Sequence, residues 1–390
     1  MIQPPDIART VLEAASKAGF ELAGIAGVDH AKELEYFPQW IAEGRAGEMK
    51  YLEARDEQGR LKRASIANAA PWARSVIVCA VNYNTAQPYS TKPADPTKGW
   101  VSRYAWSRED YHEAVLRRLR QVEAALQAAC DNHISAQSGS AGPLHNDSTE
   151  DLVVTHCYVD TGPLVERVVA KYAGIGWIGK NTCIINQKLG SWLFLGVILT
   201  SLELASQSAP LPAPDRCGSC TRCIDACPTG AFLAPYQLDS TKCISYLTIE
   251  KRGEVDNDLR LGMGRHVFGC DICQDVCPWN RKAAVTSAAE FQPRLELVNP
   301  ALEWIAEMSE EEFRTTFRRS PVRRAKREGL RRNAIIAIAN SGERKFVSVL
   351  EKLINDEDEI VRKCATWALR KLTQLVTSSN GELKSPSGGR

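Results

Sequence analysis

Two runs of cysteine in the middle of this 390-residue chain constrain its fold more than any other feature. The first run has the spacing C-x2-C-x2-C-x3-C and the second C-x2-C-x3-C, and a proline follows each. With one cysteine between the runs, the set comprises Cys217, Cys220, Cys223, Cys227, Cys243, Cys270, Cys273 and Cys277. Eight thiolates at these intervals are what two [4Fe–4S] clusters require. The pattern therefore predicts a chain that folds around two clusters and moves electrons.

The prolines predict how the cysteines divide between the clusters. In two-cluster ferredoxins the cysteine before the proline ligates the other cluster. Applied to this chain, the rule gives two sets of four cysteines, the outer set and the inner set. The outer set is Cys217, Cys220, Cys223 and Cys277, and the inner set is Cys227, Cys243, Cys270 and Cys273. Such crossing keeps both clusters within tunnelling distance of each other.

Other uses of these cysteines fit the sequence poorly. Disulfide frameworks suit small secreted domains, whereas this chain is long and shows no signal peptide at its start. Structural zinc usually takes C-x2-C pairs separated by a longer stretch. We therefore expect a reducing, cytoplasmic setting. The five remaining cysteines are scattered singly and are expected to be buried and inert: Cys79, Cys130, Cys157, Cys183 and Cys364.

Charge is balanced overall but uneven along the chain. With 49 basic and 47 acidic side chains the net charge is +2, so bulk charge indicates no polyanion binding. Between Arg314 and Arg332, however, nine Lys or Arg residues accompany one acid, Glu328. The longest apolar run, Trp192–Leu199, is too short to span a membrane.

The first part of the chain reads as helices alternating with strands. Residues 6–27 contain an amphipathic helix followed by a strand at Phe20–Ala26, and Tyr111–Cys130 reads as a long helix. Further strands are expected at Ala73–Tyr83, Leu152–Asp160 and Trp192–Leu204. We therefore predict an α/β (α+β) domain over residues 1–205, with loops at 86–99 and 131–150.

The rest divides into a cluster domain, a helical domain and a tail. A ferredoxin-like domain with both clusters is predicted at 206–285. Apolar periodicity predicts helices at Leu330–Ile338, Lys345–Ile354 and Ile360–Leu372, and the last of these resembles half of a HEAT repeat. We therefore expect an all-α HEAT-like domain at 286–376 and a disordered tail at 377–390.

A second informative segment, Val159–Asn186, precedes the cluster domain. Asp160 ends an apolar strand, above a helix expected to start near Pro163. The glycines at 174, 176 and 179 allow close backbone approach to a flat or bulky ligand. The residues alone leave two interpretations of Asp160 open, a functional carboxylate and a cap of the following helix.

Taken together, these segments resemble the epoxyqueuosine reductases over nearly the full length. The matching stretches are RYAWSREDYH (103–112), VDTGP and GWIGKNT (159–182), CGSCTRCIDACPTGA (217–231), CISYLTIE (243–250), GCDICQDVCPWN (269–280) and the basic segment ending LRRNA at 334. The resemblance implies a cobalamin-dependent oxidoreductase that converts epoxyqueuosine to queuosine at the wobble position of tRNA, the last step of queuosine biosynthesis.

The resemblance also implies roles for single residues. Electrons would pass from the clusters to cobalamin, and Asp160 would be the catalytic proton donor, buried against the corrin. The implied cobalamin contacts are Arg63, Tyr104, Asp160, Ser245, Cys270, Asp271, Ile272 and Cys273, while an exposed charge at Arg63 and core packing at Tyr104 stay open.

The motif at Asp110 and His112 invites comparison with a loop that supplies a cobalt-ligating histidine. Because that loop has a glycine where this chain has Val115, we expect base-off cobalamin with no protein histidine on the cobalt.

The basic segment is the expected tRNA-binding surface, since several Lys or Arg on one face are needed to neutralise phosphates. The candidate contacts are Lys251, Arg252, Arg323, Arg324, Arg327, Arg331 and Arg332, with Lys326 in the same segment. A solvated basic face is the alternative. The reacting base is expected to leave its stack in the anticodon loop.

Two other functions remain open at this stage. A corrinoid reductase of a small halogenated or epoxide metabolite would not need the basic segment or the helical tail. A plain electron carrier would leave the first 200 residues and Asp160 unused. We expect a monomer that takes electrons from an external low-potential donor and has no membrane partner.

Overall fold

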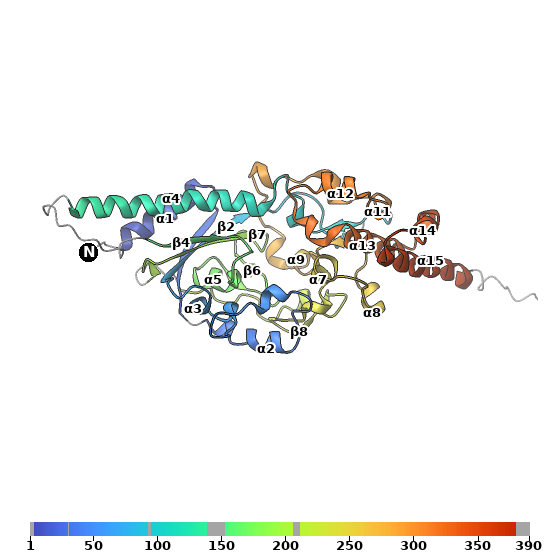
Figure 1. The fold of residues 1–390 in the computed structure, drawn as a ribbon, viewed down its shortest axis with the longest axis horizontal. Coiled ribbons are helices and arrows are strands. Elements are labelled where there is room, and N and C mark those ends of the chain that lie inside the picture. The colour runs from blue at the N-terminus through green and yellow to red at the C-terminus, as the bar shows by residue number, and fades with distance from the viewer. Residues whose placement is uncertain (1–3, 30, 93–94, 139–152, 206–210, 380–390) are drawn as a thin grey trace, which may run out of the picture.

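The computed structural model describes residues 4–29, 31–92, 95–138, 153–205 and 211–379. The molecule is elongated, with the long helix α4 (Tyr111–Ser138) reaching one end and the helices α13 to α15 forming the other (Figure 1). The predicted loop at 131–150 begins instead as the last two turns of α4, because the helix continues past Cys130. The rest of that loop and residues 380–390 of the predicted tail lie outside the described residues.

A four-stranded sheet organises the first part of the chain. Its order is β1 (Leu22–Gly27), β2 (Ser75–Asn82), β7 (Leu193–Thr200) and β4 (Thr155–Tyr158). All three neighbouring pairs are antiparallel, so the fold is the α+β form of the predicted class and not a parallel α/β sheet. Every residue of β2 is buried, as its run of apolar and β-branched residues predicts.

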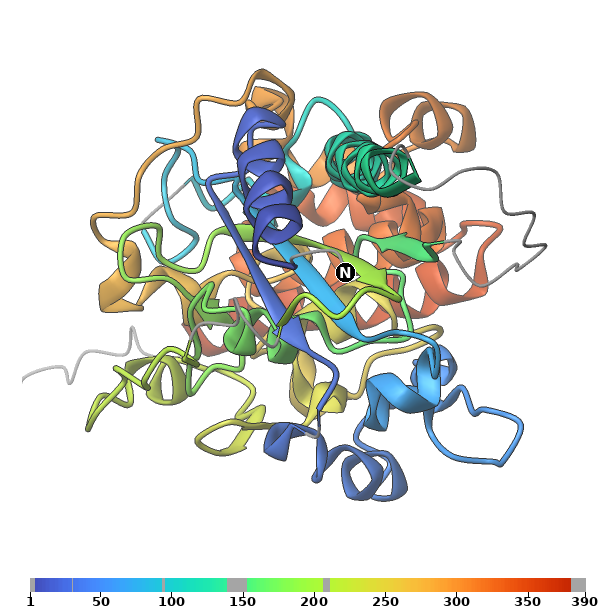
Figure 2. The same cartoon turned by 90° about the vertical axis from the view of Figure 1, so that its left-hand side faces the viewer.

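Helices cover both faces of this sheet (Figure 2). On one face α1 (Pro4–Lys17) and α4 pack on Ile25, Ile77 and Ile198. On the other face α3 (Ile66–Ala69) and α5 (Glu166–Tyr172) pack on alternate residues of the same strands, among them Val76 and Val197. Because successive strand residues point to opposite faces, one run of apolar residues supplies two cores.

The cluster segment lies between the sheet and the C-terminal helices. Its elements are α6 (Arg222–Asp225), β8 (Phe232–Ala234), β9 (Gln237–Leu238), α7 (Ile244–Ile249), α8 (Asn257–Arg260), β10 (His266–Phe268) and α9 (Ile272–Asp275). Strand β10 pairs in parallel with β3 (Trp100–Val101), far away in the sequence. The short helix η4 (Arg103–Ala105) follows β3 and packs against the cluster segment.

The C-terminal part is helical, as predicted. Its elements are α10 (Leu295–Val298), α11 (Leu302–Ala306), α12 (Glu310–Thr316), η10 (Pro321–Ala325), α13 (Lys326–Ser341), α14 (Val347–Leu353) and α15 (Glu359–Ser379). Helix α13 is buried on nearly all sides, because α11 and α15 pack on it together with β10. The final helix continues to Ser379, three residues into the predicted tail.

The remaining small elements complete the first part. They are α2 (Phe37–Ala42), β5 (Trp177–Ile178) and β6 (Ile184–Ile185), the last two forming a two-stranded ribbon. Within the described residues, every helix is too short or too polar to cross a membrane.

Candidate active site

Asp160 is presented at the end of β4 by a strained turn. Its φ of 58° lies in the left-handed region, which a non-glycine residue adopts at a cost. The following helix α5 begins at Glu166 and is capped by Val165, with no side-chain hydrogen bond at the cap. Asp160 is therefore not a helix cap. The turn leaves 68% of its side chain exposed, so the protein alone does not bury this carboxyl as we expected.

The first turn of α4 surrounds the Asp160 carboxylate. The Tyr111 hydroxyl donates to Asp160 Oδ2 at 2.9 Å, and His112 Nε2 lies 4.0 Å from the same oxygen. The other ring nitrogen, His112 Nδ1, is 2.8 Å from Asp110 Oδ1, which also accepts from the His112 amide at 3.0 Å. Burial alone would raise the pKa of Asp110, but these bonds from His112 hold that pKa below its ordinary value. Three residues of the predicted motif thus converge on Asp160.

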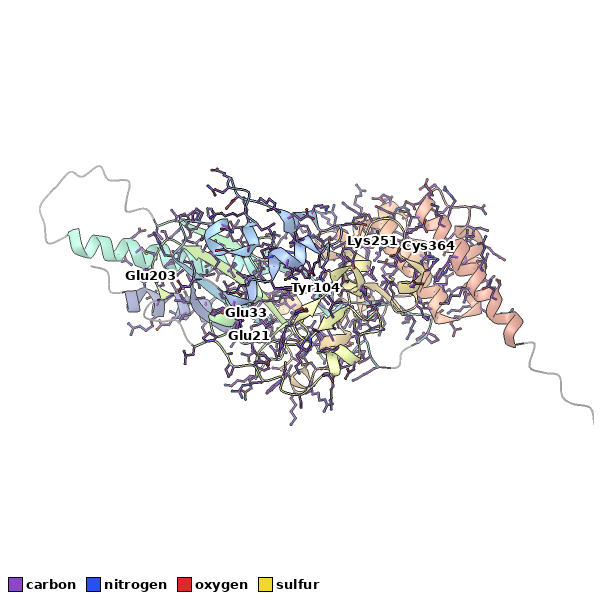
Figure 3. The ribbon with its side chains drawn as sticks, turned by 90° about the horizontal axis from the view of Figure 1, so that it is seen from below. Glu21, Glu33, Tyr104, Glu203, Lys251 and Cys364 are labelled. Carbon is purple, nitrogen blue, oxygen red and sulfur yellow. The ribbon has the colours of Figure 1, made fainter. Side chains whose placement is uncertain are left out.

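Aromatic rings support this arrangement from behind. The Tyr111 ring stacks on Phe194 of β7 at 4.4 Å between centroids and an angle of 3°, and on His112 at 3.9 Å. Tyr104 meets the edge of Tyr111 at 5.9 Å and contacts Phe268 of β10. Burial, and then the nearby Asp160 charge, raise the pKa of Tyr104 and Tyr111, so both phenols keep their protons. Figure 3 shows Tyr104 near the middle of the molecule, with Lys251 between it and the helical end marked by Cys364.

The Tyr51 ring contacts residues from both the first part and the C-terminal part of the chain. The guanidinium of Arg63 lies 5.7 Å from its ring centroid, and that of Arg324 lies 5.0 Å away. Arg324 also pairs with Glu250, at the C-terminal end of α7. Burial, then the charges of Glu250, Arg324 and Asp160 in that order, perturb the pKa of Tyr51 and leave it raised. These groups therefore face one space with Asp160.

Arg63 is not an exposed helix charge. It is 9% exposed, and it donates to the backbone oxygens of Tyr51 at 2.8 Å and Gly162 at 2.7 Å. Next to it is a cavity of about 160 Å³ lined by Arg63, Ser65, Leu164 and apolar residues of α5.

Glu166 lies at the start of α5, beside this cavity wall. Its Oε1 is buried without a hydrogen-bond partner among the described residues. Burial, and then the Asp160 charge, raise the pKa of Glu166 to about 7. A buried carboxyl oxygen without a partner indicates an absent ligand or a functional role.

Cysteines within each predicted set lie close enough to affect one another's pKa, and their division between two clusters stays a prediction. In the outer set, burial and the charges of Cys217 and Cys223 raise the pKa of Cys277, and burial and the charges of Cys217 and Cys220 raise the pKa of Cys223. Burial comes first and raises the pKa of Cys277 to about 11.

The inner set behaves in the same way. Burial, then Cys243 and later Cys227, raise the pKa of Cys270, and Cys273 senses Cys270 and Cys243. A raised pKa keeps these thiols neutral, and binding the iron of a cluster would deprotonate them. Within the described residues no three His, Cys, Asp or Glu side chains converge on a single ion position. The thiolates of a cubane need not do so, because each binds a different iron.

Cys183 is not isolated, in contrast to our prediction. Its thiol is within hydrogen-bonding contact of Cys273 of the inner set. The turn that carries it is fixed by Asn181, which donates to Cys273 O at 3.4 Å and accepts from the Cys183 amide at 3.2 Å. A ninth cysteine thus lies beside the inner set, brought there by the sheet domain.

The remaining predicted cofactor contacts lie beside the inner set. The Ser245 amide and hydroxyl both contact Cys243. The Asp271 carboxylate is buried and accepts from Ser102 Oγ at 2.5 Å and from the Arg103 amide at 2.7 Å. Its side chain therefore anchors the 270–273 turn to the sheet domain. Any contact of this turn with a cofactor would use groups other than the Asp271 carboxylate.

The basic segment divides into buried and exposed residues. Arg331 is 4% exposed and pairs with Asp356, and Arg332 is 1% exposed and donates to the backbone oxygens of Leu247, Lys251 and Gly253. The prediction that Arg331 and Arg332 bind tRNA is therefore corrected, because both guanidinium groups hold helix α13 in place. The spacing of the basic residues does not show that Arg331 and Arg332 are buried, because their burial comes from the elements that pack on nearly all sides of α13.

The exposed residues form a basic loop, Arg318–Lys326, that overhangs the site. At one end the Arg319 side chain is 70% exposed and lies 4.0 Å from Glu113, next to His112. At the other end Arg324 reaches Tyr51, and Arg323 between them is exposed. The loop therefore crosses over Asp160 from α4 to Tyr51.

The other predicted tRNA contacts lie nearby but are partly engaged. Arg327 is 19% exposed and pairs with Glu310 and Glu357. Lys251 pairs with Glu48 at 2.7 Å, and Arg252 donates to Arg324 O at 2.8 Å. Arg252 thus supports the basic loop from below.

Sequence reasoning missed Tyr51, Tyr111, Glu166 and Glu250 as site residues. Tyr111 lies inside the recognised motif, and Glu166 follows the TGP turn of Asp160 by a few residues, so motif membership could have indicated both. Tyr51 and Glu250 carry no local signal. They reach the site only because the segments around them are brought together by Arg63 and Arg324.

Comparison with known families agrees with the three parts of the chain. Residues 63–139 match the family described as "Epoxyqueuosine reductase QueG, DUF1730". Residues 216–280 match a "4Fe-4S double cluster binding domain", and residues 322–379 match "HEAT repeats".

Similar proteins cover almost the whole chain. An epoxyqueuosine reductase of Pseudomonas aeruginosa is 37% identical over 380 residues, which is 95% of this chain and 96% of that protein. Two solved structures have TM-scores of 0.78 and cover 98% of this chain and 96% of theirs. One is an epoxyqueuosine reductase with an epoxyqueuosine-modified tRNA-Tyr stem loop, 26% identical. The other is that of Bacillus subtilis, solved with the catalytic loop swung out of the active site, 27% identical.

Proposed function

Because the chain belongs to the epoxyqueuosine reductase family, we infer that it reduces epoxyqueuosine to queuosine in tRNA. The structural observation that carries this inference is the position of Asp160. Its exposed carboxyl acts on Tyr104 together with Asp271 of the inner set's turn, and on Arg324 of the basic loop, which supports a site where electrons and a nucleic acid base would meet.

We propose that the two cysteine sets hold two [4Fe–4S] clusters in the crossover arrangement. The mutual charge effects within each set support this division. The inner set lies closer to Asp160, since Asp271 in its turn binds the segment that carries Tyr104. Electrons would therefore enter at the outer set and leave from the inner set.

The cavity of about 160 Å³ beside Arg63 is too small for a corrin, and neither Asp160 nor Tyr104 lines it. We propose that cobalamin instead occupies the space that Asp160 faces, which Tyr51, Arg63 and Arg324 border. The residues that would hold it are Arg63, Tyr104, Ser245 and the turn 270–273. When bound, the cofactor supplies a strongly reducing, nucleophilic metal centre. His112 is engaged with Asp110 and Asp160, which supports a base-off form without a protein histidine ligand.

The protein's own contribution to the chemistry is proton delivery. Opening the epoxide and forming the alkene consumes two electrons and two protons and releases water. Tyr111 donates to Asp160 Oδ2, so Oδ1, to which no described residue donates, is the oxygen left to transfer a proton to the substrate. The Tyr111 bond and the stacked His112 orient the carboxyl, and the exposed face of Asp160 leaves room for the substrate base.

The basic loop supports tRNA as the substrate. Its exposed Arg319, Arg323 and Lys326 lie where phosphates flanking a flipped base would pass. A reductase of a free small molecule would gain nothing from such a loop.

The direct test uses anaerobically reconstituted protein, tRNA carrying epoxyqueuosine and a chemical reductant, with nucleosides analysed by mass spectrometry. Conversion to queuosine that requires both cobalamin and intact cysteines is the expected result. Absence of conversion with fully loaded protein, or equal turnover of a free epoxide metabolite, would contradict the proposal.

A further inference from the structure

Three of the four outer cysteines lie in an exposed stretch of the chain. Cys217, Cys220 and Cys223 are partly exposed, and Gly218 and Ser219 between them are exposed. The inner cysteines are half-exposed too, but residues next to them are buried, among them Ile244, Gly269 and Asp271, whose carboxylate ties the 270–273 turn to Ser102. Figure 2 shows the segment around residues 211–238, in yellow-green, at the edge of the molecule.

Three separate segments meet around the outer set. Lys180 donates to Gly218 O at 2.6 Å, and the amide of Tyr236 donates to Lys180 O at 3.1 Å. Trp177 packs edge-on against Trp279 at 5.0 Å, and both lie in one apolar cluster with Cys217 and Cys277. The surface over the outer set is therefore built from residues 177–180, 213–236 and 277–282.

This surface carries an excess of positive charge. Its basic residues are Lys180, Arg216, Arg222, Arg281 and Lys282, and its acidic residues are Asp215 and Asp225. Both acids are engaged locally: Asp215 accepts from the Cys217 amide and the Tyr236 hydroxyl, and Asp225 accepts from Thr221.

The basic residues are available to a partner. Within the described part of the chain, Arg216, Arg222, Arg281 and Lys282 form no ion pair, and all four are exposed. The chain as a whole has 49 basic and 47 acidic residues, so this local excess is not a general property of the surface. An exposed Tyr236 side chain adds an aromatic contact.

We propose that this surface docks a small, acidic one-electron carrier protein of the flavodoxin or ferredoxin class, which reduces the outer cluster. The proposal rests on the assignment of the outer set as a cluster site. Positive charge over the entry point complements an acidic carrier and raises its rate of encounter. In each encounter the carrier loses one electron and the outer cluster gains one, and two encounters supply the two electrons that each epoxide consumes.

The test compares two electron donors on the same loaded enzyme. In Arg222→Glu/Arg281→Glu/Lys282→Glu, the rate of cluster reduction by flavodoxin hydroquinone at low salt, followed by stopped-flow absorbance, should fall by about tenfold or more. It should also lose most of its salt dependence. Reduction by methyl viologen radical, which needs no docking, should stay within about twofold of wild type. The matched control Lys345→Glu/Lys352→Glu, which reverses exposed charges on the C-terminal helices, should leave both rates unchanged.

Other outcomes have defined meanings. Because Arg222 lies between two ligands, iron content is measured first, and Arg281→Glu/Lys282→Glu serves alone if the triple variant loses iron. An unchanged flavodoxin rate in the iron-replete variant, or an equal fall in the control, overturns the proposal. A loss of tRNA affinity with a normal flavodoxin rate would assign this surface to nucleic acid instead. Viologen-driven conversion of tRNA by the wild-type enzyme tests the proposed function separately, since it needs no carrier protein.

Discussion

Removing positive charge from the basic loop should weaken tRNA binding in a salt-dependent way without destabilising the protein. The variant Arg319→Gln/Arg323→Gln/Lys326→Gln removes three exposed charges, each from a side chain that is not buried in the fold. Each phosphate contact to a single strand contributes about 0.7 to the slope of log K against log salt, so three contacts contribute roughly two units. Between 50 and 200 mM salt, the wild type should therefore lose roughly fifteenfold more affinity than the variant.

The assay is fluorescence anisotropy with a labelled anticodon stem loop at several salt concentrations. Because exposed substitutions rarely change stability by more than about 0.5 kcal/mol, thermal unfolding of the variant should match the wild type. The charge-matched control Lys345→Gln/Lys352→Gln/Lys363→Gln, on the helices beyond the loop, should keep the wild-type slope. If the loop variant keeps the full slope, or if the control loses as much, phosphates do not contact this loop and the reasoning fails.

Four further predictions follow from single contacts. Asp160→Asn should retain both clusters and cobalamin but lose roughly 10²–10⁴-fold in turnover, and near-normal turnover would exclude it as the proton donor. Cys227→Ser should remove the spectroscopic signal of the inner cluster and not that of the outer one, which electron paramagnetic resonance can distinguish. Cys183→Ala should shift the reduction potential of the inner cluster alone, since hydrogen bonds to the sulfurs tune it, and an unchanged potential would make Cys183 a packing residue. Arg331→Ala should destabilise the fold by about 1–3 kcal/mol, because the buried Arg331 hydrogen bonds to Ala306 O and the half-buried Asp356 are lost.

The ion pair of Arg331 and Asp356 also predicts how stability depends on pH. Burial alone would raise the pKa of Asp356, but the bond from Arg331 holds it below its ordinary 3.8. A carboxylate with a lowered folded-state pKa stabilises the fold above its unfolded value and loses that contribution as the pH falls through the folded value. The wild type should therefore lose this contribution only below about pH 4, and Asp356→Asn should lack that part of the acid transition in unfolding measured from pH 7 to 3.

Much of the candidate site could be predicted because its signals are local. The cysteine spacing predicts which thiols gather together, since chelation of a cubane fixes short intervals and the proline marks the crossing residue. The helices and strands of the first and last parts followed from apolar periodicity, within a few residues at most ends. The position of Asp160 at the end of a strand was equally readable, whereas its strained turn was not.

What the sequence by itself determined are properties set by neighbours along the chain: cluster ligands, helical periods and the order of the three parts. Only the tertiary structure decided which charges are free. Arg323 and Arg331 belong to one basic run, yet the fold exposes the first and buries the second against Asp356, because α13 lies in the centre of the helical part. The same holds for Tyr51 and Cys183, whose roles depend on segments that approach from elsewhere. Long-range packing creates these contacts, and no interval in the sequence encodes them.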